Sequence, residues 1–121
     1  MSKKIVYICS PLRGNYAQNE RNARLYCREI MLRRPDVIPL APHLYFPQFL
    51  HDTVPTERSL GMSAGIELLN LCHELWVFGI ENPSEGMRQE MEYAKLHNMP
   101  ILNGHRLLHI DSTTEKEGAN I

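Results

Sequence analysis

A serine, a glycine and a glutamate lie close together in the segment Asn82–Glu90, and their spacing suits chemistry on an anionic substrate. Ser84 and Gly86 belong to a turn that follows an apolar run and opens a helical pattern. The first N–H groups of a helix lack partners within the helix and carry partial positive charge, so a phosphate or carboxylate can bind there. Glu90 follows Ser84 by six residues, and helical side chains lean toward the helix N-terminus. We therefore expect an anion site and one carboxylate in a single cleft.

The elements that must position these residues alternate between strands and helices along the chain. Short apolar runs predict strands at Ile5–Cys9, Val37–Ala41, Leu75–Phe78, Pro100–Leu102 and, as a candidate fifth, Leu107–Ile110. Amphipathic periodicity predicts helices over residues 15–33, 56–72 and 84–97. Such alternation is typical of a parallel sheet with helices on both faces. We therefore expect an α/β fold, a single doubly wound, flavodoxin- or Rossmann-like domain whose mainly parallel sheet has four to five strands.

Prolines mark one sheet edge and the irregular part of the chain. Pro39 favours an edge position for its strand, and the segment Pro42–Pro55 is expected to be irregular except for one helical turn at Pro47–His51. The domain is expected to span residues 1–110, and residues 111–121, with almost no apolar content, are expected to form a flexible tail. Periodicity places these helical side chains in the core: Ala23, Tyr26, Cys27, Ile30, Met31, Leu60, Ala64, Leu68, Leu69, Leu71, Met87, Met91, Ala94 and Leu96.

Length, charge and cysteine usage restrict the class of protein. The 121 residues suit one domain, and no apolar run approaches the ~18 residues of a membrane span. A net charge of −1 argues against a nucleic-acid groove, so we expect neither nucleic acid nor a membrane as partner. Cys9, Cys27 and Cys72 form no paired motif, and the apolar stretch after Met1 is too short for a signal peptide, which predicts reduced thiols in a cytoplasmic protein.

Two loops are expected to share a ligand crevice. In a doubly wound sheet, ligands bind beyond the carboxyl ends of the strands, where the strand order reverses. The loop Ser10–Gly14 follows the first predicted strand, and the loop Gly79–Gly86 follows the third. Arg13 can hold a phosphate through two parallel hydrogen bonds, and Gly14 would provide the turn geometry.

The same two loops carry a resemblance to a known family. The stretch Tyr7–Gly14 (YICSPLRG), taken with Pro83–Glu90 (PSEGMRQE) and the helical Ala94, resembles the motifs of the nucleoside 2-deoxyribosyltransferase-like superfamily. Within it, the chain looks similar to the 2'-deoxynucleoside 5'-phosphate N-hydrolases, and in particular to uncharacterised bacterial and phage members. The resemblance covers roughly residues 5–102 and rests on the pair of motifs, since either alone would be weak.

The resemblance implies an enzyme without metal or organic cofactor, and it implies roles for the loop residues. Glu90 would be the catalytic carboxylate, with Tyr7 orienting it. A 5'-phosphate or a sugar hydroxyl would be bound by these residues: Ser10, Arg13, Gly14, Ser84 and Gly86. Members of the family often complete the site with a neighbouring subunit, which implies a homodimer or larger homo-oligomer. The small-molecule partner would be a nucleotide or nucleoside.

The chemistry of N-glycosidic cleavage explains why a fixed carboxylate is needed. Breaking this bond builds oxocarbenium-like positive charge on the sugar, which a carboxylate below the ring stabilises or traps covalently. Such a group must be ionised, and we expect the nearby helix N-terminus to keep Glu90 in that form. Water as acceptor makes a hydrolase and a second base makes a transferase, and the sequence leaves this choice open.

The chain departs from the family pattern at the general acid. The family usually has an Asp on the helix before the third strand, whereas residues 61–70 contain none and Glu67 lies closest. His43 and Asp52, in the long loop, are candidates by chemistry alone. Tyr45 or Phe46 in the same loop could stack on a base, and the surrounding apolar stretch could instead form a lid or a subunit interface.

Two other classes of function compete with an enzyme of this kind. A non-catalytic nucleotide- or sugar-phosphate-binding module would use the same loops, and the missing Asp favours it. A metal site could draw on His43, His51, Asp52 and His73, but these residues have no recognised ligand spacing, so we expect no metal. Flavin or dinucleotide binding is disfavoured because no G-x-G-x-x-G motif follows the first strand.

Overall fold

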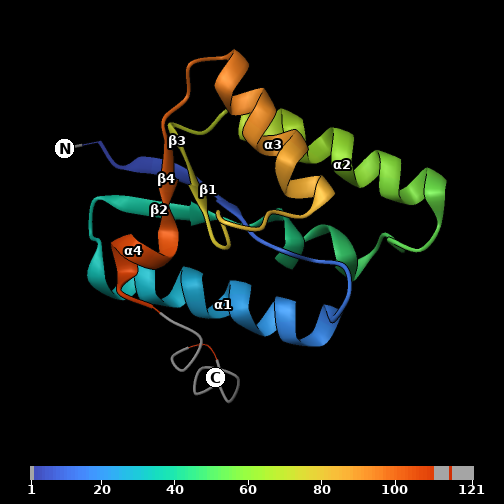
Figure 1. Ribbon diagram of the computed structural model, residues 1–121, viewed down its shortest axis with the longest axis horizontal. Helices are drawn as coiled ribbons and strands as arrows, with labels where there is room; N and C mark the ends of the chain where they lie inside the picture. The colour runs from blue at the N-terminus through green and yellow to red at the C-terminus, as the bar shows by residue number, and fades with distance from the viewer. Residues whose placement is uncertain (1, 111–114, 116–121) are drawn as a thin grey trace.

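The computed structural model describes residues 2–110 and residue 115. Four strands and four α-helices alternate over most of this range, and two short 3-10 helices follow the second strand (Figure 1). The strands are β1 (Lys4–Cys9), β2 (Val37–Leu40), β3 (Glu74–Val77) and β4 (Ile101–Asn103). The helices are α1 (Tyr16–Arg33), η1 (Pro42–Leu44), η2 (Phe46–Gln48), α2 (Pro55–Leu69), α3 (Glu85–Leu96) and α4 (Gly104–Leu108).

The four strands form one parallel sheet in the order β2-β1-β3-β4. Helices α1 and α4 cover one face, and α2 and α3 cover the other (Figure 1). The chain is therefore an α/β protein with a doubly wound, Rossmann- or flavodoxin-like sheet, as predicted. Strand β1 lies in the interior of the sheet, and the predicted edge position of β2, the strand that contains Pro39, is confirmed.

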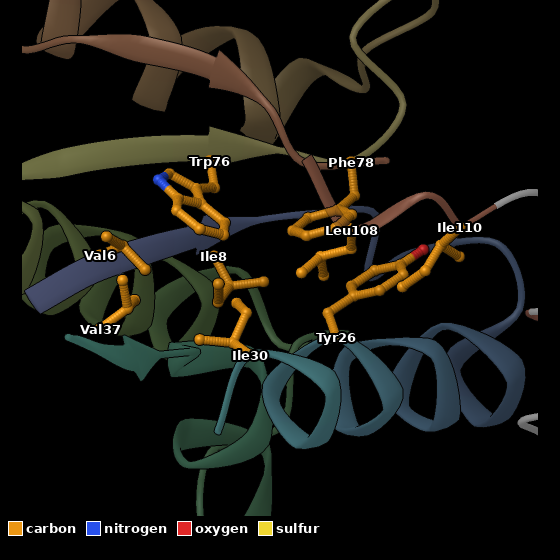
Figure 2. Close-up of a cluster of buried hydrophobic side chains, with 9 residues drawn as sticks. All are labelled: Val6, Ile8, Tyr26, Ile30, Val37, Trp76, Phe78, Leu108 and Ile110. Atoms are coloured by element: carbon orange, nitrogen blue, oxygen red, sulfur yellow. The ribbon is translucent and has the colours of Figure 1, made fainter. Parts of the chain in front are cut away.

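Strand β1 builds the two halves of the core because its side chains alternate between the faces of the sheet. Val6 and Ile8 point toward α1 and α4. There they join what we call the lower cluster (Figure 2), whose buried members are Val6, Ile8, Tyr26, Ile30, Val37, Trp76, Phe78, Leu108 and Ile110. Tyr7 and Cys9 point to the other face, where they pack beneath α2 and α3 with Leu69, Leu75, Cys72, Val77, Met87 and Ala94. The predicted catalytic tyrosine thus lies in the half of the core that carries α3.

Polar side chains cap the N-termini of α1 and α3. The Asn15 side chain accepts a hydrogen bond from the Gln18 N–H at 3.2 Å and caps α1. The Ser84 hydroxyl does the same for α3, accepting from the Met87 N–H at 3.3 Å. Each cap satisfies an N–H group that the helix itself leaves without a partner. The expected helix starts are confirmed to within a residue.

The predicted fifth strand at Leu107–Ile110 is wrong, because this region forms α4 and its C-terminal cap. Asn103 caps α4 by accepting from the Arg106 N–H at 3.2 Å, and this side chain competes successfully with an extended continuation of β4. At the start of α4, a side chain on Gly104 would overlap the Phe78 ring. The short apolar run therefore closes the lower cluster instead of extending the sheet.

The long loop is also more regular than expected. Two 3-10 helices, η1 and η2, replace the single turn predicted at Pro47–His51, because the prolines at the start of each fit the first turn of a helix. Helix α2 ends at Leu69, three residues before the predicted end at Cys72. The flexible-tail prediction for residues 111–121 falls outside the described residues except for Glu115, which accepts a hydrogen bond from the Tyr26 hydroxyl at 2.6 Å.

Periodicity misplaced some apolar side chains. Four that were expected in the core are exposed: Met31, Leu60, Leu71 and Leu96. In α2 the side that faces the sheet is built from Gly65 and Leu69, with Gly61 on the same side. Small residues occupy this side because a cavity lies beneath it, so the bulkiest residues do not mark the buried face. None of the helices in the described part of the chain combines the length and apolarity needed to cross a bilayer.

Candidate functional site

A cavity of about 150 Å³ lies where the strand order reverses. The chain leaves β1 for β2 on one side and later returns to β3 on the other, so the segments after these strands diverge and leave a space between them. The walls come from Tyr7 on β1, the loop after β1, the segment 42–52 after β2, the first three turns of α2 and the start of α3. Both loops singled out in the sequence contribute to this one cavity.

Glu90 and Tyr7 form a pair at this cavity. The Tyr7 hydroxyl donates a short hydrogen bond to Oε2 of Glu90. The other carboxylate oxygen, Oε1, is buried and has no hydrogen-bond partner among the described residues. The Cys9 thiol also lies beside this carboxylate, and it donates a hydrogen bond to the Met87 carbonyl at 3.8 Å. One oxygen of Glu90 is therefore held by Tyr7, and the other is buried without a partner among the described residues.

Burial dominates the protonation of Glu90. Loss of water around the carboxyl raises its pKa to about 7, although the Tyr7 hydroxyl and the Cys9 thiol act in the opposite direction. With a pKa of about 7, Glu90 is only partly ionised at neutral pH, so the prediction that the helix N-terminus keeps it ionised is not confirmed. Glu90 lies in the second turn of α3, where the helix dipole is already weak, and desolvation outweighs it. The same burial, together with the Glu90 charge, raises the pKa of Tyr7, which stays a neutral donor.

A glycine on α2 makes the Tyr7–Glu90 pair possible. A Cβ on Gly65 would lie 3.2 Å from the Tyr7 hydroxyl oxygen, tighter than most Cβ contacts, so the hydroxyl would have to shift by a few tenths of an ångström. The missing side chain lets α2 approach β1 while Tyr7 stays pointed at Glu90. The sequence-based predictions assigned no role to Gly65. A signal was present, because a glycine at a helical spacing of four from Gly61 suggests close approach of two backbones.

Ser84 and Gly86 line the cavity at the start of α3, as the sequence suggested. The Ser84 hydroxyl is used as the helix cap, so its oxygen is committed to the Met87 N–H. Gly86 has open space where a side chain would be, which leaves its surroundings accessible to a ligand. The first N–H groups of α3 are thus the donors that this turn offers to an anion.

Arg13 belongs to a cluster of charges on the opposite side of the cavity. Its Nε lies 3.1 Å from Oδ2 of Asp52, while Nη1 of Arg58 lies 2.9 Å from Oδ1. The Tyr16 hydroxyl donates to Oδ2 of Asp52 at 2.9 Å. Burial alone would raise the pKa of the Asp52 carboxyl, but these donors and the two positive charges hold it below its usual value. Asp52 is therefore an ionised partner of the arginines.

The candidate general acids are poorly suited to that role in this structure. His43 lines the cavity, and its Nε2 bonds the Ser10 carbonyl at 2.8 Å, so Nε2 carries the proton. Burial lowers the pKa of His43, which leaves the ring neutral near pH 7. Asp52 is ionised, and Glu67 is exposed on α2 and does not line the cavity. None of the three holds a proton ready for a leaving base.

Of the remaining predicted loop residues, some line the cavity and others do not. Ser10 is buried and does not line the cavity, and its hydroxyl has no hydrogen-bond partner among the described residues. Gly14 has a φ of +102°, which fits a turn role. Phe46 lines the cavity and could contact a base, whereas Tyr45 is 58% exposed and packs with the neighbouring rings of Phe46 and Phe49.

The structure also shows where the alternative metal ligands lie. Across residues 2–110 and residue 115, no three His, Cys, Asp or Glu side chains come close enough to hold a metal ion. Nδ1 of His73 instead accepts the Ile5 N–H at 3.0 Å, at the opposite end of β1 from the cavity. His43 and Asp52 are engaged as described above.

The fold and the cavity define a doubly wound α/β domain with a carboxylate at the switch point of its sheet. Residues 4–103 match the family model of a domain of unknown function, DUF7768, and the chain belongs to this family. The matched range runs from the first residue of β1 to the last residue of β4, so it contains every strand and every residue of the cavity. No curated protein and no solved structure matches the chain.

Proposed function

We propose that this protein cleaves the N-glycosidic bond of a deoxynucleoside 5'-phosphate or a related nucleoside, or transfers the sugar to a second base. One observation carries the proposal, the buried Glu90 carboxylate with Tyr7 on one oxygen and no partner on the other. The likeness of the two cavity loops to the nucleoside 2-deoxyribosyltransferase-like superfamily supports it independently.

In this reaction the free oxygen of Glu90 meets the anomeric carbon. As the bond from this carbon to the base breaks, its electron pair leaves with the base, and positive charge develops on the sugar. The carboxylate stabilises that charge or forms an ester with the anomeric carbon. Water then takes the sugar in a hydrolase, and a second base takes it in a transferase. Tyr7 keeps the carboxylate oriented throughout, because its hydroxyl remains a donor.

The substrate class follows from the charges around the cavity. Arg13, Arg58 and the N-terminus of α3 line the cavity and favour an anionic group, and they stand among the carboxylates of Asp52, Glu57, Glu85 and Glu90. A deoxynucleoside 5'-phosphate offers such a group at one end and the scissile bond at the other. We therefore place phosphorylated substrates ahead of free nucleosides.

The protonation of Glu90 sets the expected pH dependence. Only the ionised carboxylate can stabilise the sugar cation, and burial raises its pKa to about 7. The value of kcat/KM should therefore rise as the pH increases through about 7.

The test is the release of free base from a panel of deoxynucleoside 5'-monophosphates and deoxynucleosides, separated by chromatography. Glu90→Gln removes the charge but keeps an acceptor for the Tyr7 hydroxyl, and it should abolish release. Glu92→Gln, on the exposed side of the same helix, is the matched control and should leave the rate unchanged. Sugar exchange onto an added second base distinguishes a transferase from a hydrolase. No release from any substrate by the folded wild type would refute the proposal.

One observation favours the second candidate, a non-catalytic nucleotide- or sugar-phosphate-binding module. From Gly61 onward, the side of α2 that lines the cavity consists of Gly61, Met62, Gly65 and Ile66, none of which can donate a proton to a base. The carboxyl of Glu57, which also lines the cavity from the first turn of α2, accepts the His51 N–H at 2.9 Å. A binding module would retain ligand-induced stabilisation in the absence of turnover, and Glu90→Gln would then alter affinity alone.

Compartment and assembly form a separate proposal. Cys9, Cys27 and Cys72 are all free thiols, which supports a reducing, cytoplasmic location. Tyr45 and Phe49 are each more than half exposed next to the cavity wall, which supports a contact between subunits of a homo-oligomer. Sedimentation of the wild type against Phe49→Ser tests the assembly, because a monomeric wild type would contradict it.

A further inference from the structure

Three side chains from distant parts of the chain converge on the Asp52 carboxylate. Arg13 comes from the loop after β1, Tyr16 from the first turn of α1 and Arg58 from the first turns of α2. Their distances to the Asp52 oxygens are 3.1, 2.9 and 2.9 Å. Asp52 and Arg58 are only 15% and 20% exposed, so their pair is no ordinary surface ion pair, whereas Arg13 is 55% exposed.

Both arginines retain donors that Asp52 does not use. Arg13 contacts Asp52 through Nε and Arg58 through Nη1, whereas each guanidinium group offers five N–H bonds. Within the described residues, the other nitrogens of Arg58 have no hydrogen-bond partner, although the residue lines the cavity. Two cations share one anion here, so the Arg13–Asp52–Arg58 cluster itself keeps a net positive charge, although the carboxylates of Glu57 and Glu85 also line the cavity.

We propose that Asp52 is an internal anion that occupies the Arg13–Arg58 pair until the anionic group of a ligand replaces it. This inference rests on the proposed function for the ligand class, a phosphate monoester. A phosphate presents three oxygens to the two guanidinium groups, where Asp52 presents two. Asp52 thereby determines specificity: a ligand without an anionic group leaves the arginines paired with Asp52 and gains nothing from them.

The position of Asp52 links this exchange to the size of the cavity. Asp52 lies at the end of the segment 42–52, which forms one cavity wall. That segment is also held by His43 on the Ser10 carbonyl and by the His51 N–H on Glu57 at 2.9 Å. The cavity of about 150 Å³ is smaller than the ~300 Å³ at which small-molecule sites begin. When the phosphate replaces Asp52 at the arginines, one of the interactions that hold this wall in place is lost, which lets the cavity widen.

The experiment is a calorimetric titration with inorganic phosphate at low ionic strength. Asp52→Asn removes the competing charge and should bind phosphate about tenfold more tightly than the wild type. Arg58→Gln removes a donor pair and should bind about tenfold more weakly. Glu20→Gln is the matched control, because it removes one carboxylate from an exposed ion pair with Arg24, and its affinity should equal that of the wild type.

The outcomes separate cleanly. Equal or weaker phosphate binding by folded Asp52→Asn, or unchanged binding by Arg58→Gln, overturns the inference. If Asp52→Asn does not fold, Tyr16→Phe provides the second test, because it loosens Asp52 without changing any charge and should tighten phosphate binding about two- to threefold; no change would overturn the inference. Since no turnover is measured, a protein that releases no base can still show this pattern, so the proposed function can fail while the inference stands.

Discussion

Replacing the buried Glu90 with glutamine should make the protein more stable at neutral and alkaline pH. The ordinary pKa of a glutamate is 4.5, and burial raises that of Glu90 to about 7. Because the folded state holds the proton more tightly than the unfolded state, ionising Glu90 costs folding free energy. At about 1.4 kcal/mol for each tenfold change, the cost approaches about 3 kcal/mol above pH 7. Glutamine avoids this cost and still accepts the Tyr7 hydrogen bond.

The sign of the pH dependence is a sharper test than the magnitude. The stability that protonated Glu90 contributes is fully present below about pH 4.5 and is lost as the pH rises through about 7. The free-energy advantage of Glu90→Gln over the wild type should therefore be about 1 kcal/mol at pH 5 and about 3 kcal/mol at pH 8. Urea unfolding of both proteins at the two pH values measures this difference, and other titrating groups cancel in the comparison.

Glu92→Gln provides the control, since Glu92 is exposed on the same helix and should show no advantage at either pH. A Glu90→Gln protein that is less stable than the wild type at pH 8 would refute the reasoning. So would an advantage that is the same at pH 5 and pH 8, because desolvation of the charge would then not be its cause.

Three further predictions concern the surroundings of this pair. Tyr7→Phe removes a donor that lowers the pKa of Glu90, so the acidic limb of the kcat/KM profile should move to higher pH, and an unmoved limb would contradict the assigned role. Gly65→Ala places a Cβ 3.2 Å from the Tyr7 hydroxyl and should lower kcat/KM about tenfold; an unchanged rate would show that the Tyr7–Glu90 pair tolerates the added Cβ. Gly104→Ala forces a side chain into an aromatic ring and should lower the free energy of unfolding by about 1 to 3 kcal/mol in urea titrations; an unchanged midpoint would show that the ring yields freely.

Much of the fold was accessible from the sequence because its signals were local. β1 and β3 are short apolar runs, and α1 and α3 begin at an Asn and a Ser that cap them. The region Leu107–Ile110 failed because a run of this length does not distinguish a strand from a turn of helix. The Asn103 cap favours the helix here, but in a sequence an Asn before a glycine is equally typical of a turn.

Part of the candidate site could likewise be predicted from the sequence, and part could not. Glu90 and the Ser84 turn were found because they follow the third predicted strand, and Tyr7 because its place on the first predicted strand matches the family motif; the topology brings these segments together. The convergence on Asp52 could not be found in this way. It joins Arg13 to Arg58, 45 residues apart, through a loop whose path no periodicity determines. Long-range pairing of charges leaves no local pattern in a sequence.

The division of β1 between two faces has a consequence for how this protein can change. No buried member of the lower cluster lines the cavity, whereas Tyr7 and Met87 of the other face do. Substitutions in the lower cluster can therefore adjust the stability of the protein to the growth temperature without changing the residues that line the cavity. A library randomised at the nine lower-cluster positions should yield variants that differ in melting temperature but share one ligand preference.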